Sequence, residues 1–308
     1  MKLAHKYYLN LNRKQKNIID DLIFHVSKLY NIVNYDMHEN EYRSYSKNDN
    51  LFKTNWHCRY LHSHNRQQIL RNLDDDWKSF FNSIKKYKKN SSKFTARPNP
   101  PNYKNVNNHP AEVIFTKMAF SQTFNKSKNK NKNYLILSLS KAMQSKYRVK
   151  SLNLKLNKKV LKLLENLESI NQITIKKDKY DKLYLNIVFT KEINENKNNN
   201  NIMAIDLGLD NLATLSFLKN KETYILDGKE LKSKRKYFDK EIKYYQSIRM
   251  KQTDSKYFKD TKKIKKLRKK LFNYKHKYLH QVSNKIIKIA IKKDVKTIVD
   301  GNMKNIKQ

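Results

Sequence analysis

The stretch Met203-Ala204-Ile205-Asp206-Leu207-Gly208-Leu209-Asp210-Asn211-Leu212-Ala213-Thr214 decides the fold of the C-terminal third of the chain. It begins as an apolar strand that presents Asp206 among hydrophobic neighbours. Gly208 follows, and a glycine there lets the chain turn away and lets another backbone or a phosphate approach closely. A second apolar run comes after the turn, so the pattern predicts two consecutive short strands.

Asp206 is the candidate catalytic and metal-binding residue of this stretch. In nucleases with RNase H-like folds, a carboxylate on the first strand holds a divalent metal ion that activates water against a phosphodiester. The alternative is that Asp206 only ends its strand by hydrogen bonding to its own turn. An isolated Asp-x-Gly match is common by chance, so it does not decide between these interpretations.

The residues around this stretch predict the front half of an α/β domain. The pattern indicates three short strands at 202–207, 212–218 and 223–226, two long helices at 231–251 and 256–293, and a last strand at 295–300. Three strands, a helical crossover and a further strand are typical of such a domain. We therefore expect residues 202–308 to form the front half of an α/β domain.

The residues before it predict a different architecture, α+β with a β-unit and helices. A strand at 2–9 is followed by two amphipathic helices, whose apolar stripes span 18–33 and 69–87, with a polar stretch at 45–61 between them. Residues 112–192 alternate with a period of two, and a hairpin signal lies at 178–181. We interpret this part as a small antiparallel β-barrel. The expected domains are 1–10 plus 97–193 (barrel), 11–96 (helical insert), 194–201 (an Asn-rich linker) and 202–308.

Net charge indicates the class of partner. The 308 residues contain 68 Lys and Arg against 27 Asp and Glu, a formal net charge of +41, and such an excess favours binding to nucleic acid. The mean hydropathy is −0.93 and no apolar run is long enough to span a membrane, so we expect a soluble, intracellular protein without a membrane partner. Three glycines cannot build a Walker or Rossmann loop, which excludes ATP and NAD as small-molecule cofactors. A single cysteine excludes a four-cysteine zinc ribbon.

The most basic segment is the predicted helical pair. Residues 229–293 contain 24 Lys and Arg against 5 acidic residues. Because Ile264, Leu267 and Leu271 share one helix face, the cations are left on the others. We predict nucleic-acid contacts by five of them: Lys263, Lys266, Arg268, Lys269 and Lys270. The alternative is a solvated helix face, although such faces normally mix charges of both signs.

Two further groups of residues, one of possible zinc ligands and one of aromatic side chains, are better explained without a ligand. Four potential zinc ligands crowd into eight residues without the usual two-pair spacing, and we do not expect a metal there: His57, Cys58, His62 and His64. Four aromatic residues at helical spacing fit a packed core better than a surface for stacking bases: Trp77, Phe80, Phe81 and Tyr87.

Beyond these patterns, residues 204–216 resemble the first RuvC motif of the TnpB family, the transposon-encoded proteins once called accessory transposases. Residues 66–81 resemble the family's helical region, 100–104 its proline-rich entry to the β-unit, and 278–283 the helix before its second motif. The resemblance implies an RNA-guided DNA endonuclease related to type V CRISPR effectors. It implies a wedge-like barrel, a helical recognition insert and a RuvC-like nuclease domain. The expected partners are a guide RNA and target DNA, the expected cofactor is Mg²⁺, and the expected location is the prokaryotic cytoplasm, with the nucleoid.

The sequence also departs from the family pattern. The position that matches the family's glutamate, at the end of the strand 297–300, is Gly301, which cannot bind metal. Asp300 is adjacent, but neighbouring strand residues point to opposite faces, so it is a doubtful substitute. The family's zinc ribbon and third catalytic aspartate lie further C-terminal and have no match here, so we expect a C-terminally incomplete, nuclease-deficient DNA-binding protein. The alternatives are an active RuvC-type endonuclease completed by residues outside this chain, and a basic RNA-binding protein that needs no guide.

Overall fold

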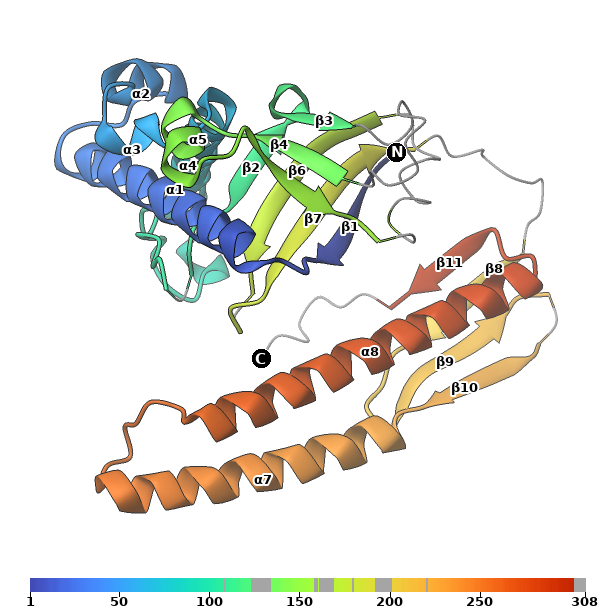
Figure 1. Cartoon of the computed structure of the whole chain (residues 1–308). Coiled ribbons are helices and arrows are strands. Elements are labelled where there is room, and N and C mark those ends of the chain that lie inside the picture. The colour runs from blue at the N-terminus through green and yellow to red at the C-terminus, as the bar shows by residue number, and fades with distance from the viewer. Residues whose placement is uncertain are drawn as a thin grey trace. The chain divides into compact units, whose positions relative to one another are not determined.

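The computed structural model describes residues 1–107, 109–122, 134–157, 160, 169–178, 180–191, 201–219 and 221–301. The chain divides into two compact units, Met1–Ile193 and Asn194–Gln308, which Figure 1 draws with their elements labelled. Of the segment interpreted as a linker, only Asn201 lies within the described residues.

Two amphipathic helices of 27 residues each dominate the N-terminal unit: α1, Arg13–Glu39, and α4, Ser63–Lys89. Both confirm the predicted apolar stripes, since α1 buries residues such as Ile19, Val26 and Leu29 completely. A capping box begins α1: the Asn12 side chain accepts the Gln15 backbone N–H, and the Gln15 side chain accepts the Asn12 N–H.

The polar stretch between these helices is itself helical, which the sequence pattern did not predict. It forms α2, Tyr45–Phe52, and α3, Trp56–Arg59. Each helix is too short to show a clear apolar period, and α2 buries a polar side chain, Asn48. That amide donates to the Arg43 carbonyl at 3.0 Å. A further short helix, α5, Lys141–Tyr147, and two 3₁₀ turns, η1, Ser91–Lys93, and η2, Lys117–Ala119, complete the helical elements described in this unit.

The strands of this unit form two antiparallel sheets. One has the order β1-β7-β6-β2, and its strands are β1, Lys2–Tyr8; β7, Leu183–Thr190; β6, Ser169–Lys177; and β2, Val113–Thr116. The other has the order β3-β4-β5, and its strands are β3, Phe120–Gln122; β4, Tyr134–Ser138; and β5, Ser151–Lys155. The predicted hairpin at 178–181 is confirmed as the β6–β7 turn.

The prediction of a barrel is wrong for the described strands, because no closed ring of pairing joins the two sheets. Alternation with a period of two predicts strands with one buried face, but closure also depends on strand tilt and stagger, which the pattern does not contain. Instead, the inner faces of the sheets share one hydrophobic core with the helices, in which Phe115, Leu137 and Ile187 are completely buried.

The C-terminal unit contains one sheet of order β10-β9-β8-β11. Its strands are β8, Ile202–Asp206; β9, Asn211–Phe217; β10, Thr223–Asp227; and β11, Thr297–Asp300. β9 runs antiparallel to β8 and to β10, whereas β11 runs parallel to β8. The C-terminal ends of β8, β10 and β11 therefore meet at one edge of the sheet. The predicted strand positions are confirmed within one or two residues.

Two long helices connect β10 to β11: α7, Lys229–Thr253, and α8, Lys262–Lys292. α8 begins later than predicted because the Thr261 side chain caps it by accepting the Ile264 N–H at 3.3 Å. The C-terminal half of α8 packs on the sheet in a core that includes Met203, Leu215 and Ala290. Its N-terminal half packs on α7 through a separate core around Ile264. Among the described residues, no helix has the length and apolar character needed to cross a membrane.

Candidate functional site

Asp206 is the last residue of β8 and lies on the open face of the C-terminal sheet. Along β8, Met203 is buried and Ile205 half-buried towards α8, whereas Ala204 and Asp206 are exposed. On the neighbouring strand β9, Asp206 is paired in register with Thr214. The carboxylate is therefore accessible to solvent and to a large ligand, at the sheet edge where three strands end.

The pairing of β11 with β8 determines where Asp300 and Gly301 lie relative to Asp206. Asp300 pairs with Ile205, so its side chain projects to the side of α8, opposite to that of Asp206. The ladder ends at the pair Asp300–Ile205, and the same register continued by one residue puts Gly301 beside Asp206. A Cβ added at Gly301 would have no atom within 4 Å. The position that would supply a second carboxylate is thus open space.

Other carboxylates at this edge are occupied by local contacts. Asp210 is paired with Lys232 at 2.5 Å, and this lysine lowers the pKa of the Asp210 carboxyl. Asp227, the last residue of β10, accepts the Lys229 backbone N–H at 2.7 Å. Glu230 accepts the Tyr274 hydroxyl at 2.5 Å. The sequence pattern had not singled out these residues, although the parallel course of β8 and β10 brings their ends to one edge.

These residues do not fit a two-metal centre. Such a centre needs several shared carboxylates around ions about 3.5–4 Å apart. Within the described part of the chain, no group of three or more His, Cys, Asp or Glu side chains is placed to hold a metal ion. Asp206 is the one predicted metal ligand whose side chain faces the open side of the sheet.

Two glycines shape the turns at this edge. A Cβ at Gly208 would lie 2.7 Å from the Asn211 carbonyl oxygen, and one at Gly228 would lie 2.7 Å from the Leu209 carbonyl oxygen. The Gly228 N–H donates to the Asp210 carbonyl at 2.7 Å. The turn after β8 and the start of α7 are therefore packed backbone against backbone, which only glycine permits.

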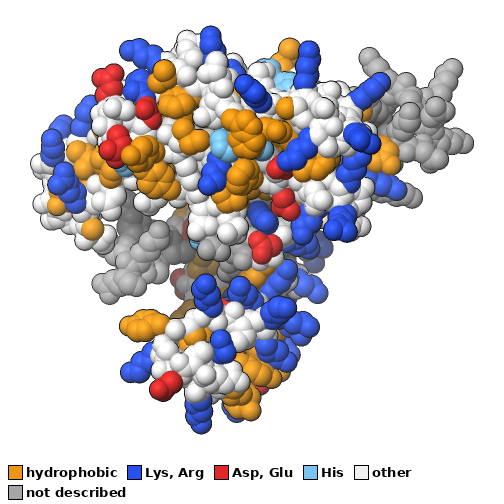
Figure 2. All heavy atoms as spheres, turned by 60° about the vertical axis from the view of Figure 1, so that its left-hand side comes forward, with side chains coloured by type: hydrophobic (Ala, Val, Ile, Leu, Met, Phe, Trp, Pro, Cys, Tyr) orange, Lys and Arg blue, Asp and Glu red, His pale blue; other side chains and the backbone are white. Residues whose placement is uncertain are grey.

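The basic residues predicted to contact nucleic acid lie on α8, which has 12 Lys or Arg and no Asp or Glu. Ile264, Leu267 and Leu271 are buried against α7, as predicted. At about 100° per residue, the five candidates divide into two flanks of this seam. Lys263, Lys266 and Lys270 are exposed on one flank. Figure 2 shows Lys and Arg side chains spread over the visible surface, with Asp and Glu in few places.

The five candidates differ in how accessible they are. Arg268 lies on the other flank, where its Nε is 2.8 Å from Asp260 Oδ2. Lys263 Nζ lies 5.1 Å from the centre of the Tyr245 ring on α7. Lys269 is half-buried. Of the four exposed candidates, Lys266 and Lys270 have no ion pair or ring contact with another described residue.

The four residues considered as zinc ligands do not converge. Cys58 is buried, its Sγ donates to the Phe52 carbonyl at 3.2 Å, and burial raises its pKa to about 11. His64 hydrogen bonds to Thr116 at 3.1 Å, and its ring stacks on that of His62. The fourth residue, His57, hydrogen bonds instead to His25 of α1. No shared ligand set forms among these four described residues.

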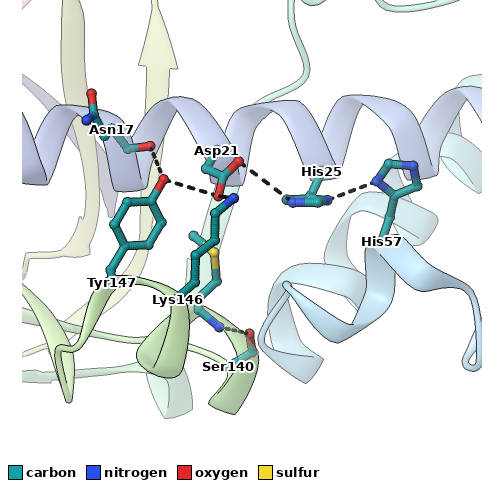
Figure 3. Close-up of polar contacts among 8 residues, drawn as sticks. Asn17, Asp21, His25, His57, Ser140, Lys146 and Tyr147 are labelled. Atoms are coloured by element: carbon teal, nitrogen blue, oxygen red, sulfur yellow. Dashed lines mark hydrogen bonds and ion pairs between the residues drawn. The ribbon is translucent and has the colours of Figure 1, made fainter.

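The partner of His57 is His25, which the sequence pattern did not identify. His25 Nδ1 lies 2.9 Å from His57 Nδ1, and its Nε2 lies 3.8 Å from Asp21 (Figure 3). Asp21 also accepts from Lys146 at 2.6 Å and from the Tyr147 hydroxyl at 3.2 Å. Burial lowers the pKa of His25 to about 4, so the ring is neutral near pH 7. The network joins α1, α3 and α5.

Three of the four aromatic residues of α4 lie in or against the core, as predicted, whereas Tyr87 is half-buried outside it. Trp77 is 6% exposed, and its Nε1 donates to Asn34 at 2.9 Å. Phe80 and Phe81 pack against the same core, and Tyr87 contacts the Phe94 ring.

Comparison with known proteins gives a family and a fold. Residues 186–307 match the family OrfB_IS605, described as a probable transposase. Among curated proteins, none matches the chain. A Cas12f1 in complex with sgRNA and target DNA is similar in structure, with a TM-score of 0.57, 14% identity, and 96% of this chain and 67% of that chain covered. A CRISPR-Cas12f ternary complex aligns with a TM-score of 0.38, 13% identity, and 94% and 63% covered.

At this identity, the likeness to the Cas12f1 structure concerns the fold: mixed α/β with antiparallel sheets. The chain spans about two thirds of the length of these structures. The family match begins within β7, at residue 186, and spans the whole sheet β10-β9-β8-β11 and both long helices. Residues 186–307 are thus similar to the OrfB_IS605 family of probable transposases, and this match confirms the chain's resemblance to the TnpB family.

Proposed function

We propose that this chain is an RNA-guided DNA-binding protein of the TnpB type whose nuclease centre is deficient. Its partners are a guide RNA and a target DNA, as in the Cas12f1 complex that it resembles in fold. The partial RNase H-like arrangement of β8, β9, β10 and β11 serves as the frame on which α8 presents cations to the phosphate backbone.

The observation that carries nucleic-acid binding is the charge of α8. Twelve cations without one acidic residue on a 31-residue helix would repel one another in isolation. Lys266 and Lys270 are exposed, whereas Arg268 is paired with a carboxylate. A polyanion that lies along the helix offsets this repulsion and releases its own counterions, which favours binding.

The observation that carries the nuclease deficiency is the register of β11. One exposed aspartate offers too few oxygens for two Mg²⁺ ions, which bind through carboxylates and keep several waters. With Gly301 beside Asp206 and Asp300 on the opposite face, Mg²⁺ is poorly supported at this edge. We propose that the chain binds its target without cutting it.

A binding titration tests the first part of the proposal. Lys263→Glu, Lys266→Glu and Lys270→Glu together should weaken binding to RNA and to RNA–DNA heteroduplex. The slope of log affinity against log salt should fall by about 0.7–0.9 for each phosphate that the variant no longer neutralises. Lys28→Glu, Lys47→Glu and Lys53→Glu change the net charge equally at exposed positions of the other unit and provide the matched control. Equal decreases in affinity for both triple variants would mean that net charge, and not the α8 surface, governs binding.

A cleavage assay tests the second part. The purified protein with its co-purified RNA, matched target DNA and Mg²⁺ or Mn²⁺ should leave the DNA intact. Cutting that requires metal and is abolished in Asp206→Ala would contradict the proposed deficiency.

One observation favours the alternative of an active endonuclease completed by residues outside this chain. Asp206 is exposed at the end of β8 and makes no hydrogen bond or ion pair with any described residue, so its carboxylate is available to a metal ion. Under this alternative, a longer version of the protein cuts guided DNA and loses the activity in Asp206→Ala.

A further inference from the structure

The sheet β1-β7-β6-β2 of the N-terminal unit has one face in the core and one face that is open along β1. Leu3 and Tyr7 of β1 pack towards the core, while the alternate residues Lys2, Lys6 and Tyr8 are exposed. β1 is an edge strand, at the margin of the sheet in Figure 1. No helix in the described chain provides an apolar partner for these outward positions.

Two tyrosines stand side by side on this face. Tyr8 and Tyr184 are paired in register across β1 and β7, and their ring centres lie 5.8 Å apart at an interplanar angle of 60°. Tyr8 is 37% exposed. Because the rings project from paired strands, the sheet fixes their positions, and little conformational entropy remains to be lost when a flat ligand stacks on them.

Two lysines lie close to the rings of Tyr8 and Tyr184. Lys6 Nζ lies 3.9 Å from the centre of the Tyr184 ring and 5.0 Å from that of Tyr8. Lys182 Nζ lies 4.3 Å from the centre of the Tyr8 ring. Neither ammonium group forms an ion pair with a carboxylate of the described residues, unlike Lys176 on the same face, which is paired with Glu112.

The outward positions of the three strands also exclude negative charge. On β1 they carry Lys, Ala, Lys and Tyr, and on β7 they carry Tyr, Asn, Val and Thr. The positions of β6 in register with them are Gln172, Thr174 and Lys176, of which Thr174 is buried, so the open part of this face lies over β1 and β7. A ligand that combines a flat aromatic face with adjacent negative charge fits this surface, and a nucleotide in a single strand has both features.

We propose that Tyr8 and Tyr184 form a base-stacking platform for single-stranded nucleic acid, with Lys6 and Lys182 contacting the phosphates on either side. A base that stacks on the tyrosine rings would displace the two lysines from them. This exchange is favourable, because an exposed cation–π contact contributes about 0.5–1 kcal/mol, whereas stacking of a base on an aromatic side chain contributes about 1–3 kcal/mol. Each flexible lysine can leave the ring and keep its charge near the phosphate. This site lies in a different unit from α8, and it deepens the proposed function because it rests on a nucleic-acid ligand.

The test uses the full-length chain and a fluorescent ten-nucleotide single-stranded RNA, with the corresponding duplex as the second probe. The double variant Tyr8→Ala/Tyr184→Ala should bind the single strand about fivefold to a hundredfold more weakly and bind the duplex unchanged. Tyr8→Phe/Tyr184→Phe keeps the rings and should retain the affinity. Tyr35→Ala, at another exposed tyrosine, is the matched control and should have no effect.

A second measurement does not depend on variants that could unfold. RNA that contains 4-thiouridine should crosslink to Tyr8 or Tyr184 of the unmodified protein under ultraviolet light. The platform is refuted by unchanged binding in the double alanine variant, by equal weakening for single strand and duplex, or by a crosslink map without either tyrosine. If the unmodified protein binds neither probe, the proposed function fails as well, whereas binding without any role for the tyrosines refutes the platform alone.

Discussion

Gly301→Glu is the most direct perturbation of the sheet edge that contains Asp206. The parallel register brings position 301 next to Asp206, and neighbouring strands are about 4.8 Å apart. Space is available, since nothing lies within 4 Å of an added Cβ and the backbone has no positive φ there. We therefore expect the variant to fold normally and to hold two carboxylates on one face.

The expected gain follows from Coulomb's law. A divalent ion about 4 Å from one additional carboxylate gains roughly 2 kcal/mol in water, because each pair of unit charges contributes about 1 kcal/mol. Screening at physiological ionic strength reduces this to about 1 kcal/mol. The affinity for Mn²⁺ should therefore rise about fivefold at physiological ionic strength, and up to about thirtyfold at low salt.

Electron paramagnetic resonance of free Mn²⁺ measures this affinity. Gly301→Glu should bind Mn²⁺ more tightly than the unmodified protein, and Asp206→Asn in the same chain should abolish the gain. Asp300→Asn is the matched control and should leave the affinity unchanged, since Asp300 faces the other side of the sheet. If Asp300→Asn removes the gain while Asp206→Asn does not, the register of β11 on β8 is wrong.

Three further results are expected. Gly228→Ala should destabilise the protein by about 1–3 kcal/mol in urea unfolding, because its Cβ would clash with the Leu209 carbonyl, whereas Gly301→Ala should be neutral. Leu267→Ala, in the α7–α8 core, should cost about 2–4 kcal/mol and raise amide hydrogen exchange in both helices; unchanged exchange would contradict that packing. His25 has a pKa of about 4 when folded and 6.5 when unfolded, so the unfolded state binds its proton first as pH falls. The free energy of unfolding should drop by up to about 3 kcal/mol between pH 6.5 and 4. A His25→Gln variant that keeps this pH dependence would show that protonation of His25 is not its cause.

Much of the fold could be predicted because several elements carry strong periodic patterns. The stripes of α1, α4 and α8 recur every three or four residues over many turns, and the β6–β7 hairpin has polar residues between two alternating runs. Alternation along a strand also predicts that Asp300 and position 301 face opposite sides of the sheet, whereas the orientation of Asp300 relative to Asp206 depends on the register of β11 on β8.

The remaining features depend on contacts between distant residues. The sequence could not show whether the strands of the β-unit close into a barrel, because the alternating pattern indicates which face of a strand is buried and not which strands are its neighbours. The pair His25 and His57 is 32 residues apart, and no local spacing brings the two rings together. The ion pair of Arg268 with Asp260 depends on the course of the loop before α8, which a count of charges does not contain.

The measurement that tests the central claim most directly is sequencing of the RNA that co-purifies with the full-length chain. The proposal of an RNA-guided DNA-binding protein predicts one defined RNA species, enriched over total RNA and retained at moderate salt. A random population of cellular RNA, or no RNA at all, would contradict it and would support a guide-independent basic protein.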